Sequence, residues 1–214
     1  MTEKTKSIKK LDYLKVISHF ISFLFHPMLM PIYGTFLLFN SGMYLSFMPL
    51  SVKKIVYLLI FLSTFVIPVS TFPLLYQFKI IKNFKMETAR ERIWPILITA
   101  FFGYIGLFIM KKMGLSGLLG YFIRAIVFSQ LFAAVISYFW KISLHTIAVG
   151  GISGTILALA FRFNLDLTIM FMILVFMSGL VGSARLYLNS HKPLQIFAGY
   201  LLGFFILFFT VILR

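Results

Sequence analysis

The chain has 214 residues, of which 61% are hydrophobic and only 12% are charged, with no cysteine and a formal net charge of +15 at pH 7. So apolar a composition excludes a soluble globular domain, and the lack of cysteine excludes disulfides and thiolate metal sites. The basic residues occupy short breaks between apolar runs, so we expect no nucleic-acid binding. The composition instead predicts an all-α integral membrane protein, which we place in the bacterial inner (cytoplasmic) membrane.

The N-terminal segment, residues 1–16, carries five lysines and leads into a long apolar run without a small-residue cleavage site. A removed signal peptide is therefore not expected, and the first span should remain in the membrane. Residues 17–214 should form one helical membrane domain. Its first span contains His19, His26, Pro27 and Pro31.

The apolar runs between the polar breaks predict seven spans, each close to the roughly 20 residues that a helix needs to cross a bilayer. The prolines of the first span predict a kink or a partly interfacial segment, which leaves a bundle of six to seven transmembrane helices. The predicted spans cover residues 17–41, 54–78, 94–110, 117–139, 143–161, 167–183 and 193–213.

Three polar breaks should emerge on one face of the membrane: residues 79–93, residues 140–146 and the break that ends at Lys192. Two predicted spans separate each break from the next, so parity brings them to the same side. Cations and two histidines at one membrane boundary predict a pocket for a phosphate. The residues gathered there are Lys85, Arg90, Arg92, Lys141, Ser143, His145, Arg185, His191 and Lys192.

The spacing within these breaks is more specific than their composition. The chain reads Lys85-x6-Arg92, Ser143-x-His145 and Arg185-x5-His191. In that order the three breaks resemble the signature motifs Lys-x6-Arg-Pro, Pro-Ser-Gly-His and Ser-Arg-x5-His-x3-Asp. These motifs belong to the type 2 phosphatidic acid phosphatase superfamily, the metal-independent lipid phosphate phosphatases. The resemblance begins at Lys85, and the later run "AGYLLG" is also similar to members of that superfamily.

The resemblance implies a helical membrane phosphatase that needs no metal and no other cofactor. His191 would be the nucleophile and form a phosphohistidine, and His145 would protonate the leaving oxygen and then activate water. The groups that would hold the phosphoryl oxygens are Lys85, Arg92, Arg185 and Ser143. The implied partners are membrane lipids, and the substrate would be a lipid phosphate monoester or diphosphate, such as phosphatidate, phosphatidylglycerol phosphate, undecaprenyl diphosphate or a lipid A phosphate.

The sequence departs from the family pattern at four places. Arg92 is separated from Pro95 by two residues, "ISLH" replaces Pro-Ser-Gly-His, and Ala184 replaces serine. The consequential change is Gln195, which occupies the position of the third-motif aspartate. In the family that carboxylate orients the nucleophilic histidine; a glutamine can accept the same N–H but brings no negative charge. The chain could use another carboxylate instead, such as Glu87 or Glu91.

Several of these residues also have simpler interpretations. Cations at span ends often set topology, and Ser143 could cap a helix. His19 and His26 match no motif, and we interpret them as structural. Arg124 lies inside a span, where an arginine either snorkels or is functional. The glycines of residues 149–155 and of "AGYLLG" predict close helix packing.

The side of the membrane on which the site opens stays undecided by the sequence. Thirteen lysines and arginines fall on the N-terminal and motif-bearing side and six on the other, which by the positive-inside rule favours the cytoplasm. Members of the family usually open their site away from the cytosol. The alternative to the phosphatase is a non-catalytic relative that binds anionic lipid or supports a membrane assembly, whereas an anion transporter is disfavoured because the sequence lacks paired broken helices. The oligomeric state is not predicted.

Overall fold

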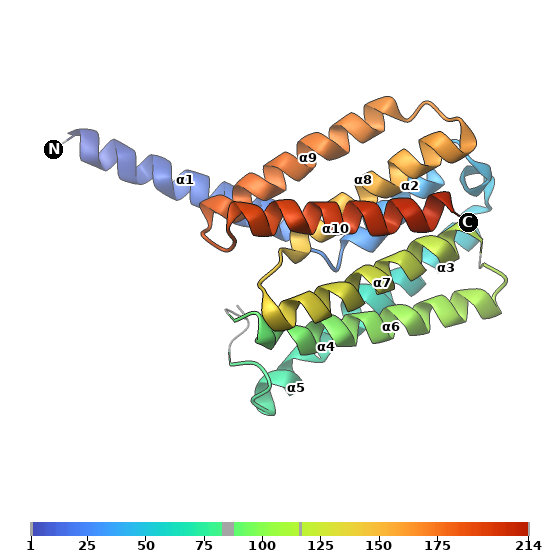
Figure 1. The fold of residues 1–214 in the computed structure, drawn as a ribbon, viewed down its shortest axis with the longest axis horizontal. Helices are drawn as coiled ribbons and strands as arrows, with labels where there is room; N and C mark the ends of the chain where they lie inside the picture. Colours follow the sequence, from blue (N-terminus) through green and yellow to red (C-terminus); the bar gives the residue numbers. More distant parts are fainter. Residues whose placement is uncertain (1, 83–87, 116, 214) are drawn as a thin grey trace.

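The protein is an all-helical bundle in which six helical segments are long and apolar enough to cross a membrane. The structure, a computed structural model, describes residues 2–82, 88–115 and 117–213. The six segments follow the predicted spans closely, and Figure 1 shows them side by side along one axis. They are Leu50–Gln77 (α3, η2, α4 and α5), Arg90–Lys112 (η3 and α6), Leu118–Phe139 (α7), Leu144–Phe163 (α8), Thr168–Tyr187 (α9) and Pro193–Ile212 (α10).

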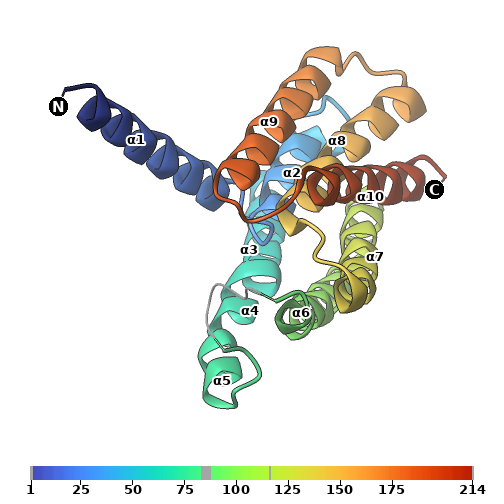
Figure 2. The same ribbon diagram turned by 60° about the vertical axis from the view of Figure 1, so that its left-hand side comes forward.

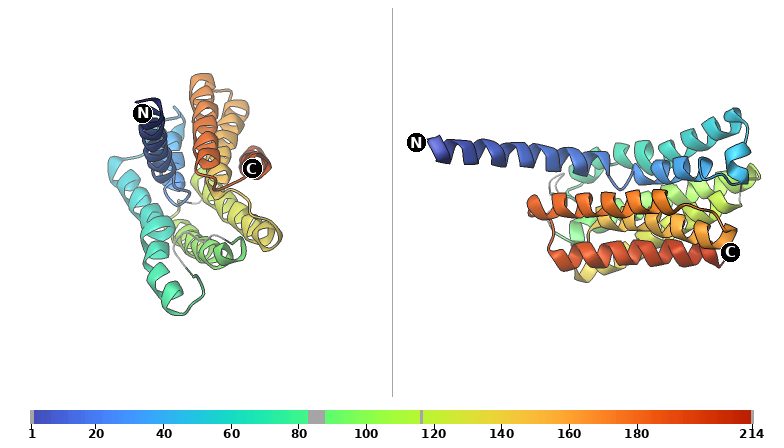
Figure 3. Two further views of the ribbon diagram at one scale, coloured as in Figure 1. Left: turned by 90° about the vertical axis from the view of Figure 1, so that its left-hand side faces the viewer. Right: turned by 90° about the horizontal axis from the view of Figure 1, so that it is seen from above.

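The first predicted span is broken into two shorter helices, α1 (Thr2–Leu24) and α2 (Met30–Phe39). Pro27 and Pro31 explain the break, because proline lacks the N–H of an internal helical bond and favours a first turn. Together α1 and α2 carry the chain from one end of the bundle to the other (Figure 1), so with the six long segments the described part of the chain runs the length of the bundle seven times. The outer part of α1 extends well beyond the bundle (Figure 2; Figure 3).

Hydrogen bonds from other elements satisfy the carbonyl groups that the break leaves without a helical partner. The Tyr33 hydroxyl donates to the Leu24 carbonyl at 3.1 Å, and the Thr64 hydroxyl reaches the Met28 carbonyl at 3.3 Å. Thr64 belongs to a π-helical turn, η2 (Leu62–Val66), within the second crossing. Such partners are what an interrupted backbone needs at membrane depth.

The three polar breaks lie at one end of the bundle, as parity predicts. Figure 1 places the turns before α6, before α8 and before α10 on the same side, together with the N-terminus, while the C-terminus lies at the other end. We call this side the motif end. The amino termini of α6, α8 and α10 all point toward it, so three helix dipoles present their positive ends there.

The tightest packing in the bundle joins α8 and α10, and it uses the predicted glycines. A Cβ added to Gly150 would overlap the carbonyl oxygen of Tyr200, and one added to Gly203 would overlap that of Ile147. The absence of side chains lets the two backbones approach closely. The packing prediction for these glycines is confirmed. Its consequence for the site is that the start of α8 is fixed beside the start of α10, where Ser143 donates its N–H to the Gln195 carbonyl at 3.4 Å.

Candidate functional site

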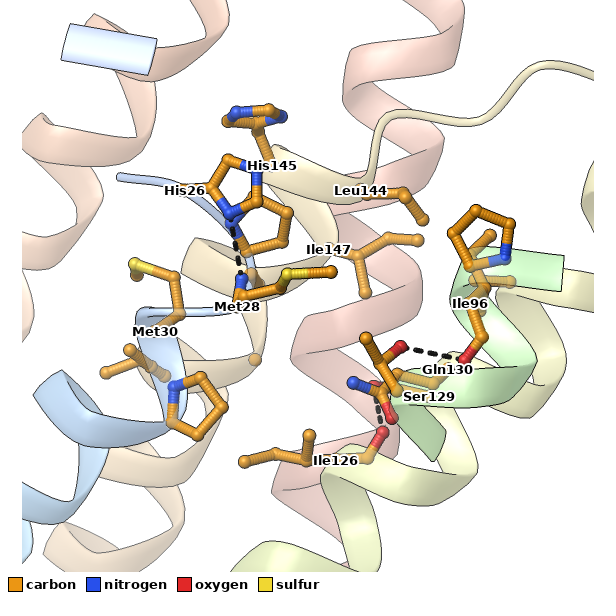
Figure 4. Close-up of a pocket in the computed structure, with 18 of the residues that line it drawn as sticks. His26, Met28, Met30, Ile96, Ile126, Ser129, Gln130, Leu144, His145 and Ile147 are labelled. Carbon is orange, nitrogen blue, oxygen red and sulfur yellow. Dashed lines mark hydrogen bonds between the residues drawn. The ribbon is translucent and has the colours of Figure 1, made fainter. Parts of the chain in front are cut away.

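A cavity of about 260 Å³ runs from the motif end into the bundle. Its outer wall contains Arg92, His145 and Arg185, together with His26 from the break between α1 and α2. Figure 4 shows His145 and His26 at one end of the cavity and Ile126 at the other, with apolar side chains between them. The cavity is therefore cationic at its mouth and apolar inside, which suits a ligand with an anionic head and an apolar body.

His191 lies just before α10, where its protonation pattern is fixed by two neighbours. The Gln195 side-chain oxygen accepts the Lys192 backbone N–H at 2.9 Å, which identifies that atom as the oxygen and not the amide nitrogen. The same oxygen lies 3.3 Å from His191 Nδ1. Nδ1 must therefore carry the proton and donate it, which leaves the lone pair of the ring on Nε2.

Arg92 meets that lone pair directly. Its Nη1 lies 3.4 Å from His191 Nε2, and since a guanidinium only donates, Nε2 is the acceptor. Arg92 is also the residue before α6, where the positive helix end reinforces its charge. An anion placed between these two groups would meet both the guanidinium and an unprotonated imidazole nitrogen.

The surroundings of His191 keep its imidazole neutral. Burial, together with the charges of Arg92, Arg185 and Lys141, lowers the pKa of His191 to about 3, while the hydrogen bond to Gln195 acts in the opposite direction. All three cations thus act on one imidazole. At neutral pH this side chain is a neutral base, the form in which a histidine can act as a nucleophile.

His145 lies in the first turn of α8, and its hydrogen bond points at α1. Its Nε2 is 3.1 Å from the Ser22 carbonyl oxygen, which can only accept, so Nε2 carries the proton. His26 packs edge-on against the His145 ring, with ring centres 5.7 Å apart. His26 Nδ1 in turn accepts the Met28 backbone N–H at 3.4 Å. In the neutral ring of His145, the unprotonated nitrogen is therefore Nδ1.

Arg185 occupies the last turn of α9, where a cation is favoured by the helix dipole. Its Nη1 donates to the Ser22 hydroxyl at 3.5 Å. Its Nε is buried and has no hydrogen-bond partner in the part of the chain that the structure describes. Ser22 therefore joins His145 and Arg185, and Arg185 keeps an N–H for an anion.

Of the predicted site residues that the structure describes, only Arg92, His145 and Arg185 line the cavity; His191 and Gln195 do not line it and are joined to it through the contact of His191 with Arg92. Ser143 is fully buried, makes no side-chain cap to α8 and does not line the cavity, and its hydroxyl has no partner among the described residues. Its predicted alternative role as a helix cap is therefore not observed. Lys85 and Glu87 lie outside the described residues. Glu91 Oε2 is buried without a hydrogen-bond partner within residues 2–82, 88–115 and 117–213, so His191 pairs with Gln195 and not with that oxygen.

The sequence prediction missed the contribution of the first segment. Ser22 and His26 lie far from the three motifs in the chain, yet the structure places them against His145. The available signal was a histidine followed by proline inside an apolar run, which predicted the kink but not its place beside the motifs. Arg124, by contrast, lies over the Tyr121 ring at 5.3 Å and does not line the cavity.

Comparison of the chain with family models, with curated proteins and with solved structures gives no match. No group of three or more histidine, aspartate or glutamate side chains that could hold a metal ion occurs among the residues described. The class that the fold and composition define is an all-α integral membrane protein.

Proposed function

We propose that the protein is a membrane phosphatase that hydrolyses a lipid phosphate monoester or diphosphate through a phosphohistidine, without a metal. The observation that carries the proposal is the pairing of His191 with Arg92 and Gln195. Nδ1 donates to a fixed oxygen, Nε2 is unprotonated, and a guanidinium stands 3.4 Å from it. A nucleophile beside a phosphate-binding cation is the arrangement that phosphoryl transfer to histidine needs. The proposal includes the location of the protein in the bacterial inner membrane and its relation to the phosphatidic acid phosphatases.

The first half of the proposed reaction transfers the phosphoryl group. His191 Nε2 bonds to phosphorus while the bond between phosphorus and the lipid oxygen breaks, and the leaving oxygen takes a proton from His145. Arg92 and Arg185 hold the non-bridging oxygens. In the second half His145 takes a proton from water, the hydroxide bonds to phosphorus, and the bond to Nε2 breaks. The products are inorganic phosphate, the lipid alcohol and the original imidazole.

The hydrogen bond from His145 to Ser22 decides how this proton is supplied. Because Nε2–H is donated to the Ser22 carbonyl, Nδ1 of the neutral ring has no proton to give. A phosphate monoester binds a second proton with a pKa of about 6. The monoanion of the substrate can pass that proton to Nδ1, and the imidazolium then gives it to the leaving oxygen. Ser22 stabilises the imidazolium through its carbonyl dipole.

A second candidate, a non-catalytic relative that binds anionic lipid, is favoured by one observation. Gln195 supplies an oxygen acceptor but no charge, so the imidazolium-like state of His191 that develops when the phosphohistidine forms lacks the carboxylate found in the family. The same cations would then bind a phosphate headgroup without turnover.

The test is inorganic phosphate release by the purified, detergent-solubilised protein from a panel of lipid phosphates in EDTA. The proposal expects release that EDTA does not affect and that His191→Ala abolishes. His19→Ala is the matched control, because His19 is exposed on α1 and does not line the cavity. Absence of release from every lipid by a folded protein would favour the lipid-binding candidate. Release that survives in His191→Ala would contradict the role of His191 as the nucleophile.

A further inference from the structure

The inner part of the cavity is a channel with apolar walls. Three polar side chains, Thr99, Ser129 and Gln130, line it beyond the cationic mouth. The Thr99 hydroxyl donates to the Ile96 carbonyl, and the Ser129 hydroxyl to the Ile126 carbonyl, each at 2.8 Å (Figure 4). Both hydroxyls are therefore used within their own helices.

Gln130 is directed toward a neighbouring helix. Its side-chain oxygen lies 4.0 Å from the position that a Cβ would take on Gly103 of α6. This oxygen faces the α6–α7 contact, where it is buried and has no hydrogen-bond partner among the described residues. The other inner lining residues are apolar: Met28, Met30, Phe122, Ile126, Ile152 and Leu207.

The channel runs along the helices and not across them. Its lining on α7 extends from Ala133 near the motif end to Phe122. Eleven residues separate these positions, which is about 16 Å of helix at a rise of 1.5 Å per residue. On α8 the lining runs in the same direction, from His145 to Ile152. A ligand held by Arg92 and Arg185 would extend its apolar part down this length.

Phe122 closes the far end of the channel. Its side chain is fully buried, and the tip of its ring contacts the backbone of α2 at Gly34, where an added Cβ would overlap it. Leu207 of α10 also lines the channel and packs against Gly151 of α8, where an added Cβ would lie 3.0 Å from it. The channel therefore has a floor, and the floor depends on the size of one aromatic ring.

We infer that the channel binds a single hydrocarbon tail of the phosphate-bearing amphiphile and that Phe122 sets the tail length accepted. The inference rests on the proposed function for the identity of the headgroup. A tail longer than the channel would have to displace the Phe122 ring. A shorter tail would leave apolar wall uncovered and bind about fourfold less tightly for each methylene not buried.

The test compares alkyl phosphates of increasing length, from butyl through octyl and dodecyl to hexadecyl phosphate, as substrates and the corresponding alkyl phosphonates as ligands that cannot be hydrolysed. Phosphate release gives kcat/KM, and the rise in melting temperature with phosphonate gives binding. In Phe122→Leu the ratio of kcat/KM for a longer alkyl phosphate to that for a shorter one should rise about tenfold, which corresponds to the burial of about two more methylenes. Ile126→Phe narrows the channel one turn nearer the mouth, so the same ratio should fall in this variant.

Phe39→Leu is the matched control. Phe39 is 2% exposed, so it is as deeply buried as Phe122, but it packs against Tyr57 and does not line the channel. It should lower stability without changing the length preference. The same change in Phe39→Leu and Phe122→Leu, or no change in either, would overturn the inference.

The two proposals fail separately. Phosphonate binding whose length preference follows Phe122, without phosphate release from any substrate, would refute the phosphatase and retain the channel. Release with a length preference that no channel variant alters would refute the channel and retain the phosphatase.

Discussion

Gln195 is the residue on which the chemistry of the site depends most. It is the third residue of α10, and its oxygen accepts both the Lys192 backbone N–H and the His191 ring N–H. The first bond caps the helix start, as an acceptor at this position commonly does. The second selects the tautomer in which Nε2 is unprotonated and accepts from Arg92. One neutral oxygen therefore orients the His191 ring, but it adds no negative charge beside it.

Gln195→Asp should raise kcat for phosphate release. An aspartate at this position would keep an oxygen acceptor beside Nδ1 and add a charge that stabilises the developing imidazolium, so an increase of about tenfold is expected, equivalent to 1.4 kcal/mol of barrier. Gln195→Leu, which keeps the volume and removes the acceptor, should lower the rate. A rate in Gln195→Asp equal to or below that of the unaltered protein would contradict this account of the glutamine.

The pH profile of kcat/KM should lack an acid limb near the ordinary pKa of histidine. Burial and three cations lower the pKa of His191 to about 3, so the nucleophile is already neutral throughout the range above that value and gains nothing as the pH rises. The proton required at His145 comes from the substrate, so kcat/KM for a phosphate monoester should rise as the pH falls from about 8 to about 6. Loss of activity between about pH 7 and pH 5 would show that His191 titrates normally.

At the scale of residues, the sequence predicted which side chains lie at the same end of the bundle but not which hydrogen bonds they form. Arg92, His145, Arg185, His191 and Gln195 do lie at one end of the bundle, with Arg92 and Gln195 in hydrogen-bond distance of His191. Their catalytic roles stay predictions. The partners of His145 could not be predicted, because the Ser22 carbonyl is a main-chain group and motif spacing carries no information about it.

At the scale of elements, the α8–α10 pair is the scaffold of the site. Each of these helices begins at the motif end and contributes a histidine near its start, His145 from α8 and His191 from the turn before α10. The glycine contacts fix the separation and register of the two backbones, so they also fix the relative position of the two rings. Periodic small residues predicted this packing from sequence alone, because helix association in a membrane depends on close backbone approach.

Gly203→Ala should destabilise the protein and reduce activity together. The added Cβ would overlap the Ile147 carbonyl oxygen, and moving the backbones apart to relieve the overlap should cost about 1–3 kcal/mol. Gly179→Ala is the control, since a Cβ at Gly179 in α9 has no atom within 4 Å. Thermal unfolding and phosphate release would be measured for both. Equal melting temperatures in the two variants would contradict a tight α8–α10 contact.

The break between α1 and α2 shows the limit of sequence reasoning about elements. Pro27 and Pro31 predicted an irregular first crossing, which the structure confirms. The depth of the break and its position beside α8 depend on how Thr64 and Tyr33 satisfy its carbonyls. Such tertiary contacts leave no local pattern in the sequence.

At the scale of the whole molecule, seven passes place the two termini at opposite ends of the bundle. The N-terminus shares the motif end with the site, and the C-terminus lies at the other (Figure 1). The six long apolar segments were predicted to within four residues at each end, because hydrocarbon thickness sets their length. The sidedness in the membrane is not a property of the fold, and charge bias and family resemblance give opposite predictions for it.

Single-cysteine labelling should resolve the sidedness and test the parity. The chain has no cysteine of its own, so each introduced thiol is unique. Lys82→Cys and Lys192→Cys should react with a membrane-impermeant maleimide from one side, and Asp166→Cys and Met113→Cys from the other. All four positions are exposed. Labelling of Lys82→Cys and Lys192→Cys from different sides would contradict the fold.

The course of α1 gives the site a mechanical property. Its inner end holds His145 through the Ser22 carbonyl and Arg185 through the Ser22 hydroxyl, while its outer part projects past the bundle (Figure 2). A helix transmits displacement along its axis because its hydrogen-bonded turns are stiff. The projecting part is therefore continuous with the turn that holds His145 and Arg185, the residues proposed to handle the proton and the phosphate. Because α1 also packs along α9, an axial displacement of α1 would act on His145 and on the end of α9 together.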